Sequence, residues 1–543
     1  MGAVIEELSN KKLFTILSIL GVIQIIFFIL GATYSPEPSS SMDYLMTVCE
    51  DSTPDIKKWI HIRPSNCKII PELHKYTSKS SSRRDIVFQA QMPHIRNGIQ
   101  LEYSPWFQFL LGILDITIEY DPNIIMDEEI LMEFEVRMGY KDKKDNDWKE
   151  LYNINVTRKL RCSIEEERKI KGNTYNCDPV DLFELSSNPY PFYLLNIRIP
   201  VTDETCKLNP KAPNCALGLI DEIRFITIHQ NGGFTYIWLL IKTLITPFIA
   251  YGNYWYFKRI NNLNRPRYLV EDCILTLGVS TLLLDIPFEW ITIFMKWPLL
   301  LLFNDIKQGI FYTILFSFWL IFAGEHLEES GYGNTLKNYW KNLTLIVISS
   351  IGFLFYDSIE RGIQVVNPFF TIWSSDVGTK IATITLQCSC LSLILYVGFL
   401  IYKVILVWNN IRRKREAQLY QSNPLRRIKI ENIIFRFKFL MIFTVLCAIL
   451  TVTTYAFKQI GEIQYHDADP TDSLLTSWTS AFFIGTFGMW NIYVMLLLAM
   501  YAPSHKYFKE ARILMSEIND CMDSLSGGNE TASLTTLLKP STD

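Results

Sequence analysis

The sequence predicts a membrane α-helical bundle of eight spans, one anchor helix plus a seven-helix receptor-like bundle, with an all-β sandwich domain between the first and second spans. Three observations predict this fold class. Of the 543 residues, 49% are hydrophobic and 14% are aromatic, and they gather in long apolar runs. A polar segment with strand-like alternation separates the first run from the others. Basic residues crowd the loops on one side of the runs, as is typical of the cytosolic side.

The first apolar run, 13–32, follows a short segment, 1–12, that ends with Lys11 and Lys12. The run is longer than the roughly 7 to 15 apolar residues at the core of a cleaved signal peptide. We therefore expect a retained signal anchor with its amino terminus in the cytosol.

The polar segment 33–233 is predicted to form a lumenal β-sandwich. Its residues change from apolar runs to a periodicity of two, which places apolar side chains on one face of a strand and polar ones on the other. The alternating or strand-like stretches are 86–91, 115–120, 132–138, 193–201 and 223–229.

This segment also holds six of the eleven cysteines, Cys49, Cys67, Cys162, Cys177, Cys206 and Cys215. An even number in a water-exposed segment predicts an oxidising compartment and up to three disulfides. Neighbouring positions favour Cys49 with Cys67, Cys162 with Cys177 and Cys206 with Cys215, although six cysteines allow about 15 connectivities. Asn155 begins an Asn-Val-Thr sequon, so we predict glycosylation there.

Seven further apolar runs predict a helical bundle over 234–501, with spans at 234–257, 269–294, 306–324, 339–359, 381–408, 433–457 and 478–501. Counting from a cytosolic amino terminus places the strongly basic loop 409–436 in the cytosol, in agreement with the positive-inside rule. The tail, 502–543, is polar and rich in Ser and Thr, so we expect a disordered cytosolic segment.

One stretch, 305–326, carries more aromatic side chains than solubility in lipid requires. They lie between a charged rim that contains Asp305 and Lys307 and another that contains Glu325 and His326. Packing against neighbouring helices explains the surplus. The alternative is a wall around an apolar ligand.

Ionisable residues in or near spans are costly, and they are therefore candidates for function. Asp285 and Glu289 have the spacing of paired carboxylates on one helix face, but Pro287 interrupts it, and hydrogen bonding within the bundle is the better explanation. The segment 325–329 contains one histidine and lacks the two-histidine spacing of a zinc helix. We find no phosphate loop, nucleophile elbow or dinucleotide fingerprint. The sequence therefore predicts no enzyme, metal, cofactor or nucleic-acid partner.

Two alternative classes contain similar bundles. A G-protein-coupled receptor is suggested by seven spans after an extracytosolic domain, and 360–362 resembles the acidic-Arg-Tyr triplet of the rhodopsin-like family. However, this triplet lacks the tyrosine and lies at the lumenal end of its span. A small-molecule or lipid transporter would show internal repeats between halves, and we see none.

Eight blocks, in order along the chain, resemble the Wntless family of sorting receptors for lipid-modified Wnt proteins. They are 104–109, 193–200, 228–235, 305–326, 360–362, 367–369, 435–441, and 488–493 with 501–506. They run from the predicted lumenal domain to the last predicted span, so the resemblance extends over the chain up to its tail.

The resemblance implies a cargo receptor whose lumenal sandwich and bundle together bind acylated Wnt. The residues expected to line an acyl-chain cavity are Asp305, Lys307, Phe311, Tyr312, Leu315, Phe353, Glu360 and Arg361. Those expected to contact cargo in the lumenal domain are Trp106, Phe107 and Phe109. It also implies retromer and clathrin adaptor partners, contact with membrane lipids, and cycling among the endoplasmic reticulum, Golgi, plasma membrane and endosomes with both termini cytosolic.

The sequence departs from the family in its expected sorting signal. The family's tyrosine-based adaptor motif precedes block 435–441, but Ile430 stands where the tyrosine is expected, although the bulky Ile433 is kept. Glu510, Leu514 and Met515 have the spacing of an acidic dileucine signal and are the candidate substitute. Chance and a short amphipathic helix explain that spacing equally well.

Overall fold

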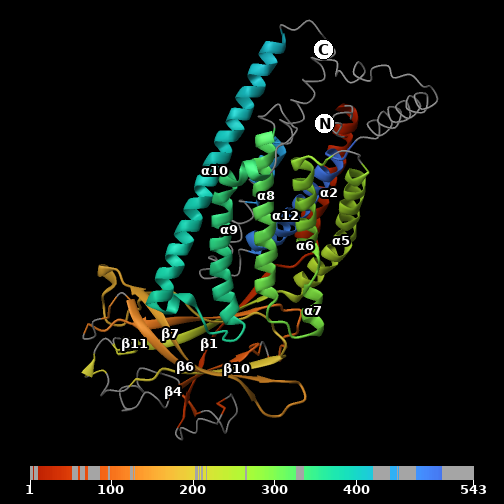
Figure 1. Ribbon diagram of the computed structural model, residues 1–543. Coiled ribbons are helices and arrows are strands. Elements are labelled where there is room, and N and C mark those ends of the chain that lie inside the picture. The colour runs from red at the N-terminus through yellow and green to blue at the C-terminus, as the bar shows by residue number, and fades with distance from the viewer. Residues whose placement is uncertain are drawn as a thin grey trace, which may run out of the picture.

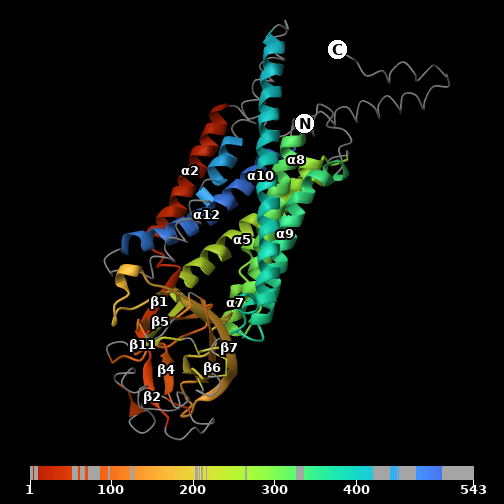
Figure 2. The same ribbon diagram turned by 90° about the vertical axis from the view of Figure 1, so that its left-hand side faces the viewer.

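The computed structural model describes residues 4, 10–51, 59–60, 68–70, 86–95, 98–122, 126–127, 129–201, 206, 208–209, 212–215, 217–262, 266–325, 336–419, 441–448, 450–451 and 473–503. Within them, a β domain lies at one end of a bundle of long helices (Figures 1 and 2). The chain passes from the helix α2 (Asn10–Thr33) into the β domain and leaves it through the strand β11 (Leu219–Gln230) into α5 (Gly232–Asn261).

The β domain consists of two antiparallel sheets. One sheet has the order β1-β11-β5-β9 and the other β3-β2-β4-β10-β6-β7-β8. The other strands are β1 (Ser39–Leu45), β2 (Thr47–Glu50), β3 (Lys68–Ile69), β4 (Ile86–Met92), β5 (Leu110–Glu119), β6 (Glu129–Lys141), β7 (Lys149–Ser163), β8 (Asn176–Cys177), β9 (Val180–Leu185) and β10 (Phe192–Arg198). One hydrophobic cluster contains side chains from both sheets, as in a sandwich.

Buried and accessible residues alternate along the strands of these sheets, and the buried set forms their inner faces. Every second residue of β5 is buried, including Leu114, Ile116 and Ile118. In β6 the buried positions include Met132 and Phe134, while the residues between them are more accessible. Because successive side chains of a strand point to opposite faces, this pattern puts the apolar set between the sheets.

Disulfides cross-link neighbouring segments of this domain. Cys162 in β7 is bonded to Cys177 in β8, and Cys206 is bonded to Cys215. These are the pairs favoured by their neighbouring positions in the sequence. Cys49 is also disulfide-bonded, and its predicted partner, Cys67, lies outside the described residues.

The bundle contains α5, α6 (Leu269–Asp285), α7 (Glu289–Phe294), α8 (Leu300–Glu325), α9 (Leu336–Gln364), α10 (Asp376–Leu419) and α12 (Ser473–Met500), and α2 lies alongside α12. In the described part of the chain, six helices are long and apolar enough to cross a membrane: Lys11–Thr33, Gly232–Asn261, Leu300–Glu325, Tyr339–Gln364, Asp376–Asn410 and Thr479–Met500. Many large apolar side chains on α2, α9 and α10 are exposed, as expected for faces in contact with lipid.

The predicted span 269–294 is not one continuous helix. It divides into α6 and α7, and the residues between them include Pro287. Proline lacks an N–H donor and clashes with the preceding turn, which explains the break. The predicted span 433–457 lies only partly within the described residues, of which 441–448 are helical.

A close approach joins the anchor to the bundle. A Cβ atom on Gly31 of α2 would lie 2.6 Å from the Cα of Ala481 in α12, so only glycine allows the two backbones to approach in this way. Most of the inner core of the bundle comes from α5, α6, α8 and α12, including Tyr256, Leu277 and Tyr493, and Val407 of α10 and Cys447 complete it.

Candidate functional site

The junction between the β domain and the bundle is the first place where predicted site residues meet. The loop between α9 and α10 inserts Phe369 into the core of the β domain, where 2% of the residue is exposed. Its ring lies 5.5 Å from that of Phe183 and 6.0 Å from that of Tyr152. The Glu184 N–H also donates a 2.9 Å hydrogen bond to the Pro368 carbonyl, so the loop continues the edge of β9.

Arg158 of β7 binds this loop to the β domain through hydrogen bonds. It occupies an inward-facing position of β7, and its guanidinium donates to the carbonyl oxygens of Phe369 at 2.6 Å, Leu182 at 3.0 Å and Asp181 at 2.7 Å. Burial lowers the pKa of Arg158 to about 10, and the side chain therefore remains cationic at neutral pH. A buried cation thus links two strands and the loop through backbone oxygens alone.

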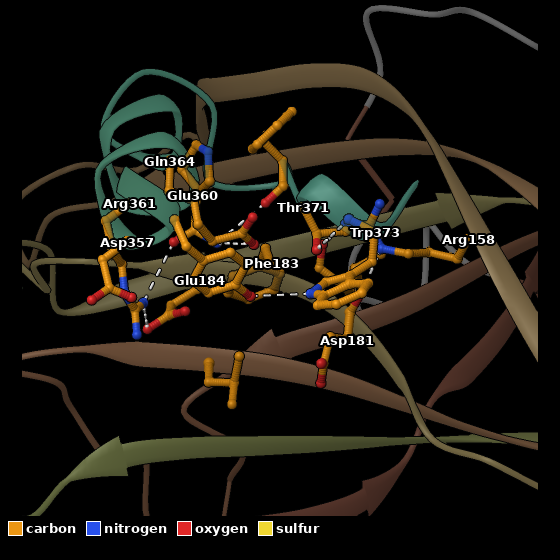
Figure 3. Close-up of a pocket in the computed structure, with 15 residues that line it drawn as sticks. Arg158, Asp181, Phe183, Glu184, Asp357, Glu360, Arg361, Gln364, Thr371 and Trp373 are labelled. Carbon is orange, nitrogen blue, oxygen red and sulfur yellow. Dashed lines mark hydrogen bonds and ion pairs between the residues drawn. The ribbon is translucent and has the colours of Figure 1, made fainter. Parts of the chain in front are cut away.

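Arg361, at the end of α9, provides the ionic part of the junction. It forms an ion pair with Glu184 of β9, and its Nε lies 3.7 Å from Oδ2 of Asp305 in α8. The neighbouring Glu360 accepts a 2.8 Å hydrogen bond from the Ile372 N–H and a 3.3 Å bond from Gln364 Nε2. Two helices, one strand and one loop therefore converge at this point. Figure 3 shows Arg361, Glu360 and Glu184 at the junction.

A pocket of about 270 Å³ lies at this junction, between the β domain and α9. Its charged lining consists of Arg158, Asp181, Glu184, Asp357, Glu360 and Arg361. Trp373 and Tyr356 contribute aromatic surface, and the Trp373 indole N–H donates to the Tyr356 hydroxyl at 3.2 Å (Figure 3). Mixed charges beside aromatic rings suit a polar peptide surface better than a purely apolar chain. Among the described residues, no group of three or more His, Cys, Asp or Glu side chains could hold a metal ion.

A second contact is made by the loop that holds the predicted cargo residues. The Trp106 ring lies 5.8 Å from that of Tyr236 in α5 and 6.0 Å from that of Trp290 in α7. Next to it, Gln108 accepts a 2.9 Å hydrogen bond from Thr292 of α7.

The other two cargo candidates, Phe107 and Phe109, are half-buried. The Phe107 ring packs 5.0 Å from that of the buried His229. The structure therefore places this loop against the bundle, and its contact with cargo stays a prediction.

The predicted acyl-chain residues fall into two groups. Asp305, Glu360 and Arg361 lie at the junction, as described above. The others lie in the helices: Lys307, Phe311 and Leu315 are buried in α8, Tyr312 is half-buried beside them, and Phe353 is half-buried in α9.

The aromatic surplus of α8 packs against other helices in this structure. The Phe311 ring lies 5.8 Å from that of Trp490 in α12, and the Phe316 ring lies 5.9 Å from that of Tyr396 in α10. The Trp319 indole N–H donates to the Tyr493 hydroxyl at 3.1 Å. Packing therefore accounts for these side chains, and a role as a cavity wall stays a prediction.

A buried ionic cluster lies at the break between α6 and α7. Lys242 of α5 forms a 2.6 Å ion pair with Glu289 of α7, and both side chains are almost fully buried. Asn491 of α12 donates a 3.4 Å hydrogen bond to Asp285 at the end of α6. Lys307 of α8 lies within electrostatic range of these charges. Asp285 and Glu289 therefore do not act as a pair of cooperating carboxylates. Each is paired instead with a residue of another helix, Asp285 with Asn491 and Glu289 with Lys242.

Sequence reasoning did not name four residues of these sites as site residues, Arg158, Phe369, Lys242 and Asn491, although Phe369 and Asn491 lie in the family blocks 367–369 and 488–493. The sequence did indicate Lys242 as a candidate for function, because it is the one charged residue in the apolar run 234–257. The sequence indicated Arg158 as well, since this charged residue stands between Val156 and Leu160 on the apolar face of an alternating strand.

The remaining predicted residues do not meet at either site. Asn155 is exposed on β7, where a glycan is sterically allowed. Glu510, Leu514 and Met515 lie outside the described residues, as do Ile430, Ile433 and His326.

Comparison with known proteins covers both halves of the chain. Residues 47–230 match the family model described as Wntless, GOLD domain, and residues 231–505 match that described as Wntless-like, transmembrane domain. Protein wntless homolog of Caenorhabditis elegans is 52% identical over 548 residues, which cover 100% of both chains. The proteins of the same name from Mus musculus and Homo sapiens are each 38% identical over 514 residues, which cover 94% of this chain and 92% of theirs.

Proposed function

Since this chain belongs to the Wntless family, we propose that it is a non-enzymatic cargo receptor that binds lipid-modified Wnt protein and escorts it to the cell surface. The observation that carries the proposal is the match of both the β domain and the bundle, in order and over nearly the whole chain, to this one family. In this proposal, the receptor then recycles for another round of transport.

The physical need for such a carrier follows from the lipid. An acyl chain of roughly sixteen carbons costs on the order of 10 kcal/mol to expose to water, at about 0.8 kcal/mol per methylene. Transfer from the bilayer into an apolar protein slot is nearly neutral on the same scale. The bundle would therefore shield the acyl chain, while selectivity among cargoes would come from polar contacts with the β domain.

The junction described above is the surface that we assign to the protein part of the cargo. Its pocket combines the partly exposed Arg361 with four carboxylates, so it offers charged groups of both signs to a folded partner. It lies where the β domain meets the helices, so a cargo bound there could place an attached acyl chain next to the bundle.

The proposal places the β domain in the lumen of the secretory pathway and both termini in the cytosol. The disulfides of the β domain support an oxidising compartment, and the basic residues of 409–436 support a cytosolic position for that loop. Golgi, plasma membrane, endosomes and endoplasmic reticulum are the compartments that such a carrier would visit. Retromer and a clathrin adaptor would contact its cytosolic segments, and membrane lipids would surround its helices.

Thermal unfolding of the purified full chain tests the proposal. We expect acylated Wnt at about 100 times its dissociation constant to stabilise the protein by about 2.7 kcal/mol. The same Wnt with its acylated serine replaced by alanine should stabilise it far less, because the acyl contribution is lost. Equal stabilisation by both forms would contradict the acyl slot, and no stabilisation by either form would contradict the cargo assignment.

A further inference from the structure

The pocket at the domain junction is preformed. Phe369 is buried in the core of the β domain, and its neighbour Pro368, which lines the pocket, accepts the 2.9 Å hydrogen bond from the Glu184 N–H. The volume of about 270 Å³ is just below the roughly 300–1,000 Å³ of small-molecule sites. The pocket is therefore suited to one long side chain rather than to a folded segment of a partner.

Both cations of the pocket already have partners. The Arg158 guanidinium donates to backbone carbonyl oxygens, among them those of Phe369 and Leu182. Arg361 is paired with Glu184 and lies 3.7 Å from Asp305. An anion that entered the pocket would have to compete with these contacts, so the pocket is not built for an anion.

Two carboxylates of the pocket remain without such partners. Asp181 is exposed and Asp357 is half-buried, and within the described part of the chain neither side chain takes part in a hydrogen bond or an ion pair. Four carboxylates face two guanidinium groups in the lining, so the pocket keeps an excess of negative charge. A cationic ligand would reduce this excess.

An aromatic wall lies beside these carboxylates. Trp373 is 40% exposed, and its ring centroid lies 6.3 Å from that of Tyr356. The Trp373 indole N–H already donates to the Tyr356 hydroxyl, as Figure 3 shows. Because its one polar group is used, Trp373 offers a ligand the face of its ring, and such faces attract cations.

The combination of ring faces and carboxylates favours one kind of cation. A quaternary ammonium group has no N–H to donate to a carboxylate, and a lysine ammonium is a compact, strongly hydrated charge. A guanidinium group is planar, stacks on aromatic rings and carries five N–H donors that match carboxylate oxygens. The chemistry of the pocket is therefore that of an arginine site.

We propose that the junction pocket binds an arginine side chain of the cargo protein, with the guanidinium against Trp373 and paired with Asp181 and Asp357. The identity of the partner rests on the proposed function, whereas the preference for a guanidinium does not. Arginine and tryptophan are enriched among the residues that dominate protein interfaces. An arginine held here would anchor the protein part of the cargo at the point where the β domain meets α9.

The test uses the full chain in a maltoside detergent, whose headgroup is uncharged. The probes are the peptide acetyl-Gly-Arg-Gly-amide, the same peptide with lysine, and the same peptide with citrulline, which keeps the shape of arginine without its charge. Binding is measured by titration with saturation-transfer NMR. We expect the arginine peptide to bind at least tenfold more tightly than the citrulline peptide and at least threefold more tightly than the lysine peptide.

Conservative variants locate the site. Asp181→Asn and Asp357→Asn should each weaken binding of the arginine peptide at least threefold, because each removes one charge and keeps the shape of the side chain. Asp376→Asn is the matched control, since Asp376 is another carboxylate of the junction, 84% exposed, that does not line the pocket. Without peptide, thermal unfolding of all three variants should match wild type, because no hydrogen bond of Asp181 or Asp357 is lost.

Each other outcome has a definite meaning. Equal binding of the arginine and citrulline peptides, equal binding to wild type and both pocket variants, or no binding at all would overturn the site. Tighter binding of glycerophosphocholine than of the arginine peptide would also overturn it and assign the pocket to a lipid headgroup. Should one pocket variant fail to fold, the other still tests the site.

A second arm separates this inference from the cargo assignment. Weaker stabilisation of Asp357→Asn than of wild type by acylated Wnt would support the use of the pocket by cargo. Equal stabilisation of both would overturn that use while the receptor function stands. Asp357-dependent binding of the arginine peptide without any response to acylated Wnt would support the guanidinium site and contradict the receptor function.

Discussion

Arg361 at the end of α9 forms an ion pair with Glu184 of β9, so a helix of the bundle is fixed directly to the edge strand of the β domain. The same guanidinium lies 3.7 Å from Asp305 at the start of α8. A single side chain thus connects two helices and one strand, and the first prediction concerns its loss.

Replacing Arg361 with Gln should loosen the junction. The side chains of Arg361 and Glu184 are 29% and 21% exposed, so we expect a loss of about 1–2 kcal/mol, between the values for exposed and for buried pairs. Hydrogen exchange should accelerate at Glu184, whose N–H bonds to the α9–α10 loop. Arg224→Gln is the control, because the ion pairs of Arg224, with Glu222 and with Asp43 of β1, both stay within the β domain. Unchanged exchange at Glu184 would argue against a clamp.

Replacing Phe369 with Ala should destabilise the β domain, although the residue belongs to the helical half of the chain. Truncation of a buried phenylalanine typically costs about 3–5 kcal/mol because a cavity remains. The cost should appear as faster hydrogen exchange in β7 and β9. Val366→Ala, in the same loop at 79% exposure, should have almost no effect. A similar effect of both substitutions would contradict the role of Phe369 as a core residue.

Acidification should weaken the β domain through His229. Burial lowers the pKa of His229 from 6.5 to about 4, so the unfolded chain binds its proton first as the pH falls. Stability is therefore full above pH 6.5 and is lost progressively toward pH 4, by about 3 kcal/mol in total at about 1.36 kcal/mol per pKa unit. Denaturant unfolding at several pH values should show this slope, and His229→Gln should remove it. The control is His94→Gln, at an exposed histidine. A slope that persists in His229→Gln would assign it to other groups.

Asn155 should carry a glycan if the β domain faces the lumen. The residue is exposed on β7, so an oligosaccharide meets no packed neighbour. Peptide N-glycosidase should increase the electrophoretic mobility of wild type, and Asn155→Gln should already have the faster mobility. Asn342→Gln is the control, because residues 342–344 also form a sequon, Asn-Leu-Thr, at the end of the predicted span 339–359 that should face the cytosol. Glycosylation at Asn342 instead would reverse the proposed topology.

Much of the architecture follows from periodicity. The alternation in β5 and β6, the long apolar helices and the identity of the family were all predicted from the sequence and are confirmed. These features are predictable because each depends on residues that lie close together in the chain. The division of α6 from α7 was anticipated only in part, since Pro287 shows where a helix breaks but not where the second piece goes.

The site was less predictable because its contacts join distant segments. Phe369 stands in a turn that reads as an ordinary loop, and nothing near it in sequence shows that it completes a core more than a hundred residues upstream. Arg158 bonds to backbone oxygens, which carry no residue-specific signal. Asp305 and Arg361 were named as one group with Phe311, yet they face the junction while Phe311 faces the bundle.

The position of Phe369 has a consequence for biosynthesis. Strand β11 ends at Gln230, so the ribosome completes every named strand of the β domain well before it reaches the residue that fills the core. At about 5–20 residues per second, the wait is on the order of ten seconds, during which α5 to α9 are made. Throughout that interval the rings of Phe183 and Tyr152 lack the Phe369 ring that packs against them in the finished protein. Completion of the β domain thus reports that the membrane helices up to α9 have been synthesised and placed.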